Sequence, residues 1–157
     1  MQNGEEQFWK LIGKMNVAML STFSGNTIHA RPMHAVARSD YGDIVMLTDR
    51  NLAKDNEIEH NHSVTLTYSD GSHTFVSVEG AAEVSTDRSI INDVWSNAAK
   101  IYWPDGPDDP NIVALLVTPH AVEYWDGDNK FVSGIKIAYG LATHSTPSLG
   151  DNRKLRL

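Results

Sequence analysis

The chain has 157 residues, no cysteine and a formal net charge of −7, with 20 acidic against 13 basic residues. This length suits one domain with a real core, since a chain of this size buries roughly 70% of the surface that it would expose when unfolded. The acidic balance argues against nucleic acid or an anionic membrane as a partner, and the lack of cysteine excludes disulfides, thiolate nucleophiles and cysteine-based metal sites. No apolar run is long enough for a signal peptide or a membrane span, so we expect a cytoplasmic protein.

The first third of the chain predicts a helix, a β-hairpin and a buried strand. Four apolar residues have the spacing of one helix face: Phe8, Leu11, Ile12 and Met15. Residues 16–23 and 28–37 are strand-like and are separated by Ser-Gly-Asn, a turn signal. Residues 44–48 are apolar up to a final threonine, which is typical of a strand buried on both faces. A short polar helix is expected over residues 54–61.

The middle third predicts two more strands and an amphipathic helix. Residues 64–68 and 75–84 are strand-like, and the second run alternates cleanly between apolar and polar positions. Gly80 lies in the middle of that run and predicts a bend or a bulge. Residues 86–87, Thr-Asp, are a candidate N-cap, and the apolar stripe that follows predicts a helix as far as Ala98.

The last third begins with a loop rich in Pro, Gly and Asp over residues 101–111. Two strands are expected next, at 112–117 and 121–125, separated by Thr-Pro-His. A helical run around 134–139 and a polar tail, expected to be loosely held, complete the chain. Strands joined mostly by short turns, with two or three helices, predict a small antiparallel barrel of the α+β kind.

Two basic residues suggest a way to hold an anion. Strand alternation places Arg31 and Met33 on one face, and Pro32 between them implies an edge, a bulge or a backbone that serves something else. Lys54 is expected at a helix start, where backbone N–H groups and the helix dipole favour phosphate. The alternative is that Arg31 and Lys54 are ordinary surface residues.

Other chemistries find no support in the sequence. It contains no glycine-rich phosphate loop and no Gly-x-Ser-x-Gly elbow. His60-x-His62 is the one close histidine pair, and it falls in a polar turn that we interpret as solvated, so no metal site is expected. No side chain stands out as a catalytic acid or base.

Several motifs, in order along the chain, resemble one family. They are Ala-Arg-Pro-Met at 30–33, Val-Met-Leu-Thr-Asp at 45–49 followed by Lys54, Tyr-Trp-Pro-Asp-Gly at 102–106 with Asp-Asp-Pro at 108–110, Ala-Val-Glu-Tyr-Trp-Asp at 121–126, and Leu-Gly-Asp-Asn-Arg-Lys-Leu at 149–155. Together they resemble the split-barrel FMN-binding proteins related to pyridoxamine 5′-phosphate oxidase, in particular the bacterial general-stress-protein branch. The resemblance implies a mainly antiparallel, six- to seven-stranded split β-barrel with flanking helices over residues 1–145, and a C-terminal tail over 146–157.

The resemblance also implies a cofactor site. FMN, or else FAD, is expected in a groove between the two barrels of a homodimer. By position, the residues implied to line the flavin are Arg31, Pro32 and Met33; those implied to approach its ring or ribityl chain are Leu47 and Thr48; and Lys54 is implied to pair with the phosphate. Leu52 stands where many relatives carry a small hydroxyl residue.

Three aromatic residues are candidates for the wall of the groove on the partner's side: Tyr102, Trp103 and Trp125. The alternative is that they are core or interface aromatics.

The resemblance leaves the reaction open. The first hypothesis is a flavin-dependent oxidoreductase with an unidentified small-molecule redox partner, and the second is a non-catalytic protein that stores, buffers or senses flavin. A third is a split barrel that has exchanged FMN for haem or a deazaflavin. We expect no efficient oxidation of pyridoxamine phosphate, because the tail does not match the arginine-rich C-terminal strand motif of the true oxidases.

Overall fold

The structure of the protein, a computed structural model, describes residues 4–127 and 150–157, except for the side chains of 53–56, 150 and 151. The helical run expected at 134–139 and the expected domain boundary at 145 lie outside the described residues. No helix within the described ranges is long and apolar enough to cross a membrane.

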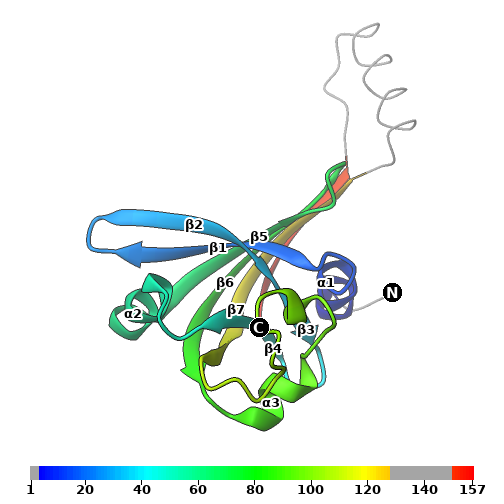
Figure 1. Cartoon of the computed structure of the whole chain (residues 1–157). Coiled ribbons are helices and arrows are strands. Elements are labelled where there is room, and N and C mark those ends of the chain that lie inside the picture. Colours follow the sequence, from blue (N-terminus) through cyan, green and yellow to red (C-terminus); the bar gives the residue numbers. More distant parts are fainter. Residues whose placement is uncertain (1–3, 128–149) are drawn as a thin grey trace, which may run out of the picture.

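The described residues form one mainly antiparallel sheet of eight strands with a few helices around it (Figure 1). The strand order is β2-β1-β5-β6-β7-β4-β3, and β8 pairs with β7. The elements are α1 (Gly4–Ile12), β1 (Val17–Ser24), β2 (Thr27–His34), β3 (Val36–Arg38), β4 (Asp43–Asp49), α2 (Ala53–His60), β5 (Ser63–Ser69), β6 (Thr74–Ser85), α3 (Arg88–Asp93), the 3₁₀ turn η1 (Ala99–Ile101), β7 (Ile112–Gly127) and β8 (Gly150–Arg156). This confirms the predicted α+β split-barrel fold, with more strands than the six or seven expected.

The main core fills the barrel beneath α1. Phe8 and Ile12 of this helix are almost fully buried, as their spacing predicted, and they join a cluster that includes Leu20, Met46 and Tyr124. Burying one such side chain stabilises the fold by about 1.5–3 kcal/mol. The cluster therefore fixes the strands that carry the site.

The expectation of two strands at 112–117 and 121–125 is wrong, because they are one strand, β7. Proline normally interrupts a sheet since it lacks the N–H donor. Here the register shifts at Gly80, so that Glu79 pairs with Ala121 and Gly80 with Pro119, and His120 is the extra residue. This confirms the bulge predicted at Gly80, where a Cβ would lie 2.7 Å from the Thr118 carbonyl oxygen.

The helix predicted after residues 86–87 forms but is shorter than expected. Asp87 is its N-cap and accepts a hydrogen bond from the Ser89 backbone N–H at 2.8 Å. The helix ends at Asp93 rather than near Ala98, and turns lead from there into η1. Val94, which follows the helix, belongs to a second buried cluster with Ile91 and Ile112, and Trp95 packs against that cluster.

The C-terminal residues are not the loosely held tail that the sequence suggested. Residues 150–156 form β8, which pairs with β7 from Ala121 to Gly127. Leu155 packs under the first residue of α1, where a Cβ on Gly4 would lie 2.9 Å from Leu155 Cδ2. In Figure 1, β8 is the red strand beside the yellow β7.

Candidate functional site

A cavity of about 540 Å³ opens between β2, β4, the start of α2 and the segment from Val94 to Trp103. This volume lies within the range of roughly 300–1,000 Å³ that is typical of small-molecule sites. The lining is mostly apolar and consists of Pro32, Met33, His34, Val36, Val45, Leu47, Thr48, Asp49, Leu52, Val94, Ser96, Ala98, Ala99, Ile101, Tyr102 and Trp103.

Five of the eight residues predicted for a cofactor site line this cavity: Pro32, Met33, Leu47, Thr48 and Trp103. Arg31 precedes Pro32 on β2 and turns its guanidinium towards α2. Lys54 is the second residue of α2, and its side chain is not described. Trp125 does not line the cavity of its own chain; it lies on β7 and pairs with Phe75 and Asn152.

Thr48 brings an unused hydrogen-bonding group to the cavity. β4 pairs with β7 from Ile44 to Asp49, which buries the middle of β4 and delivers Thr48 to its end. The Thr48 side chain is only 3% exposed, and its Oγ1 has no hydrogen-bond partner among the described residues. Buried polar groups are nearly always paired in folded proteins. The hydroxyl is therefore available to a ligand.

The first turn of α2 can receive an anion. Leu52 is its N-cap residue, with extended backbone angles and no side chain that accepts from the helix N–H groups. Asp49 forms the preceding turn and accepts from the Asn51 backbone N–H at 2.8 Å. The N–H groups of a first helical turn that no side chain caps carry the positive end of the helix dipole. This end of α2 lies at the cavity, because Asp49 and Leu52 both line it.

Arg88 secures the loop that follows the aromatic wall of the cavity, a role that no sequence pattern indicated. Its guanidinium donates to the carbonyl oxygens of Pro107 at 3.1 Å, Asp109 at 2.9 Å and Ile112 at 3.1 Å. These bonds fasten the loop after Trp103 to the start of α3. The Trp103 ring lies 6.5 Å from the Trp95 ring, centroid to centroid.

Behind the cavity, Glu57 of α2 joins a polar network with three residues of β1 and β2. Arg31 Nη2 donates to Glu57 Oε2 at 2.9 Å, His29 Nδ1 lies 2.7 Å from Oε1, and the Thr22 hydroxyl donates to Oε2. Burial of this carboxyl by itself raises its pKa, but the hydrogen bonds from Thr22, His29 and Arg31 outweigh burial and lower the pKa of Glu57 to about 2. Glu57 is therefore a carboxylate at any physiological pH.

Comparison with known proteins gives the family. A family model described as "Pyridoxamine 5′-phosphate oxidase like" matches residues 3–148, which is most of the chain. The chain belongs to this family. General stress protein 26 of Bacillus subtilis strain 168 is 26% identical over 133 residues, which cover 82% of this chain and 93% of that protein. This confirms the resemblance that the motifs indicated.

Solved structures agree with the assignment to the pyridoxamine 5′-phosphate oxidase-like family. A protein from Jannaschia sp. CCS1, described as a general stress protein 26, has a TM-score of 0.82 at 22% identity, with all of both chains covered; at this identity it shows the fold. A protein from Xanthomonas citri, described as a general stress FMN/FAD binding protein, has a TM-score of 0.69 at 26% identity, covering 77% of this chain and 87% of that one.

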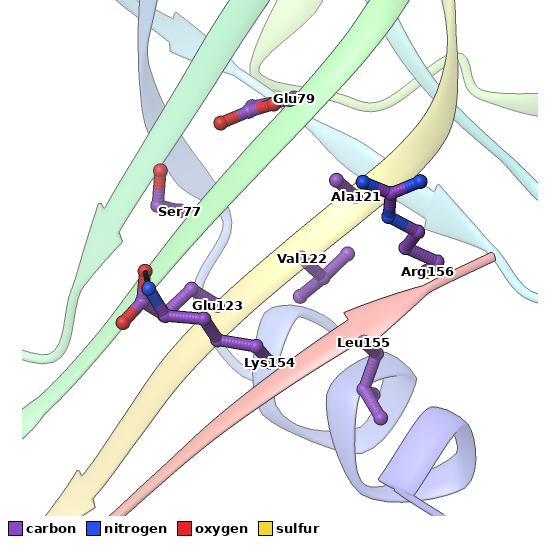
Figure 2. Close-up of a pocket in the computed structure, with 8 residues that line it drawn as sticks. All are labelled: Ser77, Glu79, Ala121, Val122, Glu123, Lys154, Leu155 and Arg156. Atoms are coloured by element: carbon purple, nitrogen blue, oxygen red, sulfur yellow. Dashed lines mark ion pairs between the residues drawn. The ribbon is translucent and has the colours of Figure 1, made fainter.

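This member of the pyridoxamine 5′-phosphate oxidase-like family has a second hollow, between β6, β7 and β8 (Figure 2). Its volume is about 240 Å³, below the range usual for a cofactor. Figure 2 shows Lys154 reaching Glu123, with Lys154 Nζ 3.3 Å from Glu123 Oε2, and Glu79 and Arg156 on either side of Ala121. Glu79, Lys154 and Arg156 are exposed, and Glu123 is partly buried. The larger cavity is thus the candidate site.

Among the side chains that the structure describes, no group of three or more His, Asp or Glu is placed to hold a metal ion. His62 Nδ1 lies 3.1 Å from the Ala82 carbonyl oxygen, in the turn before β5. Three titratable side chains line the larger cavity, namely His34, Asp49 and Tyr102.

Proposed function

We propose that this protein binds FMN in the cavity between β2, β4 and α2. The observation that carries the proposal is the Thr48 hydroxyl, which is buried, has no partner among the described residues and lies in a mostly apolar cavity beside the first turn of α2. A flavin requires an apolar surface for its ring, a few polar groups for its edge and a cationic end for its phosphate. The relative from Xanthomonas citri, described as FMN/FAD binding, supports the proposal.

Three groups of residues have different roles in the proposed binding of FMN. Met33, Leu47 and Trp103 provide the apolar surface and exclude water from it. Thr48 supplies a hydrogen bond to a polar atom of the cofactor. The first turn of α2, which contains Lys54, attracts the phosphate. The bound flavin supplies the redox chemistry, by carrying hydride or electrons.

We also propose that a second copy of the chain completes the site. An exposed apolar surface on the β1–β2 hairpin, formed by Val17, Met19, Phe23 and Ile28, is called here the hairpin patch. Met19 pairs across the hairpin with Pro32, and Pro32 lines the cavity. At the other rim Ile101 and Tyr102 are 78% and 77% exposed. A partner barrel seated on these surfaces covers the mouth of the cavity.

Two activities follow from a bound flavin, and the cavity allows both. In a flavin-dependent oxidoreductase the protein positions the cofactor and the redox partner, which requires no protein acid or base. In a non-catalytic flavin-binding stress protein the same residues retain the cofactor. The small number of titratable lining residues favours roles in which the protein only positions the flavin.

An absorbance spectrum tests the cofactor. The purified protein is mixed with FMN, desalted and scanned in the visible range. We expect flavin absorbance bands that correspond to about one FMN per chain. A protein that releases all FMN on desalting would contradict the proposal. Anaerobic mixing of the flavin-loaded protein with NADH or NADPH then separates the two activities, because rapid bleaching supports the oxidoreductase and its absence supports the binder.

A further inference from the structure

Helix α2 presents an anion-binding turn to the cavity but has little apolar surface to hold it there. Of its side chains that the structure describes, at positions 57–60, Ile58 is buried at 1% exposed, while Glu59 and His60 are exposed. Most helices keep their place through an apolar stripe. The polar contacts of α2 therefore matter more for its position than is usual.

Glu57 makes those contacts. Its side chain is 9% exposed, and both carboxylate oxygens are used, Oε1 by His29 and Oε2 by Arg31 and Thr22. The donors belong to β1 and β2, so the carboxylate joins the helix to the hairpin. These partners are 28, 26 and 35 residues away in sequence, respectively.

The same contacts orient Arg31. Its Nη1 donates to Thr22 Oγ1 at 2.6 Å while its Nη2 donates to Glu57. A guanidinium has five N–H donors, so the two bonds fix its plane and leave donors free for an anion. Arg31 does not itself line the cavity, but it lies on β2 between His29 and the lining residues Pro32 and Met33, and its guanidinium is turned towards α2, whose start adjoins the cavity.

We propose that Glu57 is the positioning residue of a phosphate subsite in this cavity, since it holds both Arg31 and the first turn of α2 in place. The proposal rests on the proposed binding of FMN. The direction in which FMN affinity changes on loss of the charge tests this role. A carboxylate near a phosphate repels it, so loss of the charge at position 57 favours FMN if Glu57 is a bystander. Loss of Glu57 weakens FMN binding if it positions the donors.

The test compares the dissociation constants of FMN and riboflavin, which differ only by the phosphate. We expect the wild-type protein to prefer FMN by at least about tenfold, and Glu57→Gln to lose about tenfold in FMN affinity with less than about threefold change for riboflavin. Glu59→Gln is the matched control, because it removes the same charge from an exposed position on the same helix. It should leave both constants within about twofold.

Each outcome decides something. Wild-type protein that binds neither flavin refutes the proposed function, whereas equal binding of riboflavin and FMN refutes the phosphate subsite and leaves flavin binding intact. FMN binding by Glu57→Gln that is unchanged or tighter, as for Glu59→Gln, overturns the positioning role. Should Glu57→Gln fail to fold, Thr22→Val removes the hydroxyl between Arg31 and Glu57 and must lose phosphate preference in the same direction; an unchanged preference overturns the proposal.

Discussion

Thr48 and Glu57 are two nearly enclosed polar side chains with opposite surroundings. Thr48 Oγ1 has no partner among the described residues, whereas the Glu57 carboxylate accepts from two strands. An unpaired buried hydroxyl costs stability, and a fully paired carboxylate contributes to it. Thr48 is thus suited to binding and Glu57 to holding structure.

Thr48→Val tests whether the Thr48 hydroxyl binds the cofactor. The change keeps the shape and removes the unpaired hydroxyl, so we expect the flavin-free protein to be as stable as wild type or more stable by up to about 1 kcal/mol. FMN affinity should fall about five- to tenfold, since a hydrogen bond contributes roughly 0.5–1.5 kcal/mol. Thermal melting and fluorescence titration measure the two effects. Thr27→Val, at an exposed position of β2, is the control; equal effects of both variants would remove Thr48 from the site.

Glu57 also predicts how stability depends on acid. Its pKa in the folded protein is about 2, below the ordinary value of 4.5, so the unfolded chain binds more protons between these values. Stability from Glu57 is therefore complete above about pH 4.5 and is lost as the pH falls towards 2. Denaturant unfolding of wild type and Glu57→Gln from pH 5 to pH 2.5 should show a steeper decline in wild type. An equal decline in unfolding free energy in the two proteins would contradict this prediction.

At the scale of elements, the cavity depends on how a loop is fastened. Residues 102–111 are joined to one another mainly by short-range turns, such as Gly106 N to Trp103 O at 3.1 Å. The Arg88 side chain connects them to α3 and β7, and the Asn111 carbonyl oxygen accepts from the Arg50 backbone N–H at 2.8 Å. Arg88, 15 positions before Trp103 in the sequence, is therefore a long-range connection that helps to hold the wall of the cavity.

Arg88→Lys keeps the charge but cannot donate to three carbonyl groups in the plane of a guanidinium. We expect a loss of about 1–3 kcal/mol in unfolding free energy and faster hydrogen exchange over residues 102–111, with exchange in α1 unchanged relative to global stability. FMN affinity should fall as the Trp103 wall loosens. Lys100→Gln is the control on the adjacent turn; exchange in the loop that matches wild type in Arg88→Lys would show that the loop holds itself.

The elements also show which structural features local sequence patterns can predict. The α1 face, the apolar run of β4 and the bulge at Gly80 were each predicted from a pattern within one segment, and all three are present, although the extra residue of the bulge is His120 on β7. The pairing of Glu57 with Arg31 and that of β8 with β7 join distant segments, and a polar helix and a polar tail gave no local sign of either. Trp103 was expected on the partner's side and lines its own chain's cavity, while the role of Trp125 stays a prediction.

At the scale of the whole molecule, exposed apolar side chains on the sheet form two groups. One is the hairpin patch, and the other is Phe75 and Trp125, which are paired on β6 and β7. Apolar surface gathered on one face usually marks an interface. The hairpin patch adjoins the cavity through the pairing of Met19 with Pro32, and this pairing makes it the surface on which a second copy would matter for the cofactor.

Ile28→Asp should give a monomer with weaker FMN binding, because it places a charge in the proposed interface at a side chain that is 63% exposed in one chain. Light scattering at micromolar concentration measures the mass, and we expect wild type to have twice the chain mass. Phe75→Asp, at an exposed apolar residue outside the hairpin patch, is the control and should remain a dimer. A wild-type monomer that retains FMN would refute the shared site.

The pairing of β8 with β7 has a consequence for folding during translation. β7 is flanked by β6 along its length, by β4 near its start and by β8 near its end. While the chain is being made, β8 leaves the ribosome after every other described strand. Until then the backbone of β7 from Ala121 to Gly127 is an open edge on an otherwise folded barrel, and open strand edges recruit other chains. A chain that ends before β8 therefore keeps this edge open, and we expect it to aggregate more readily than the full chain.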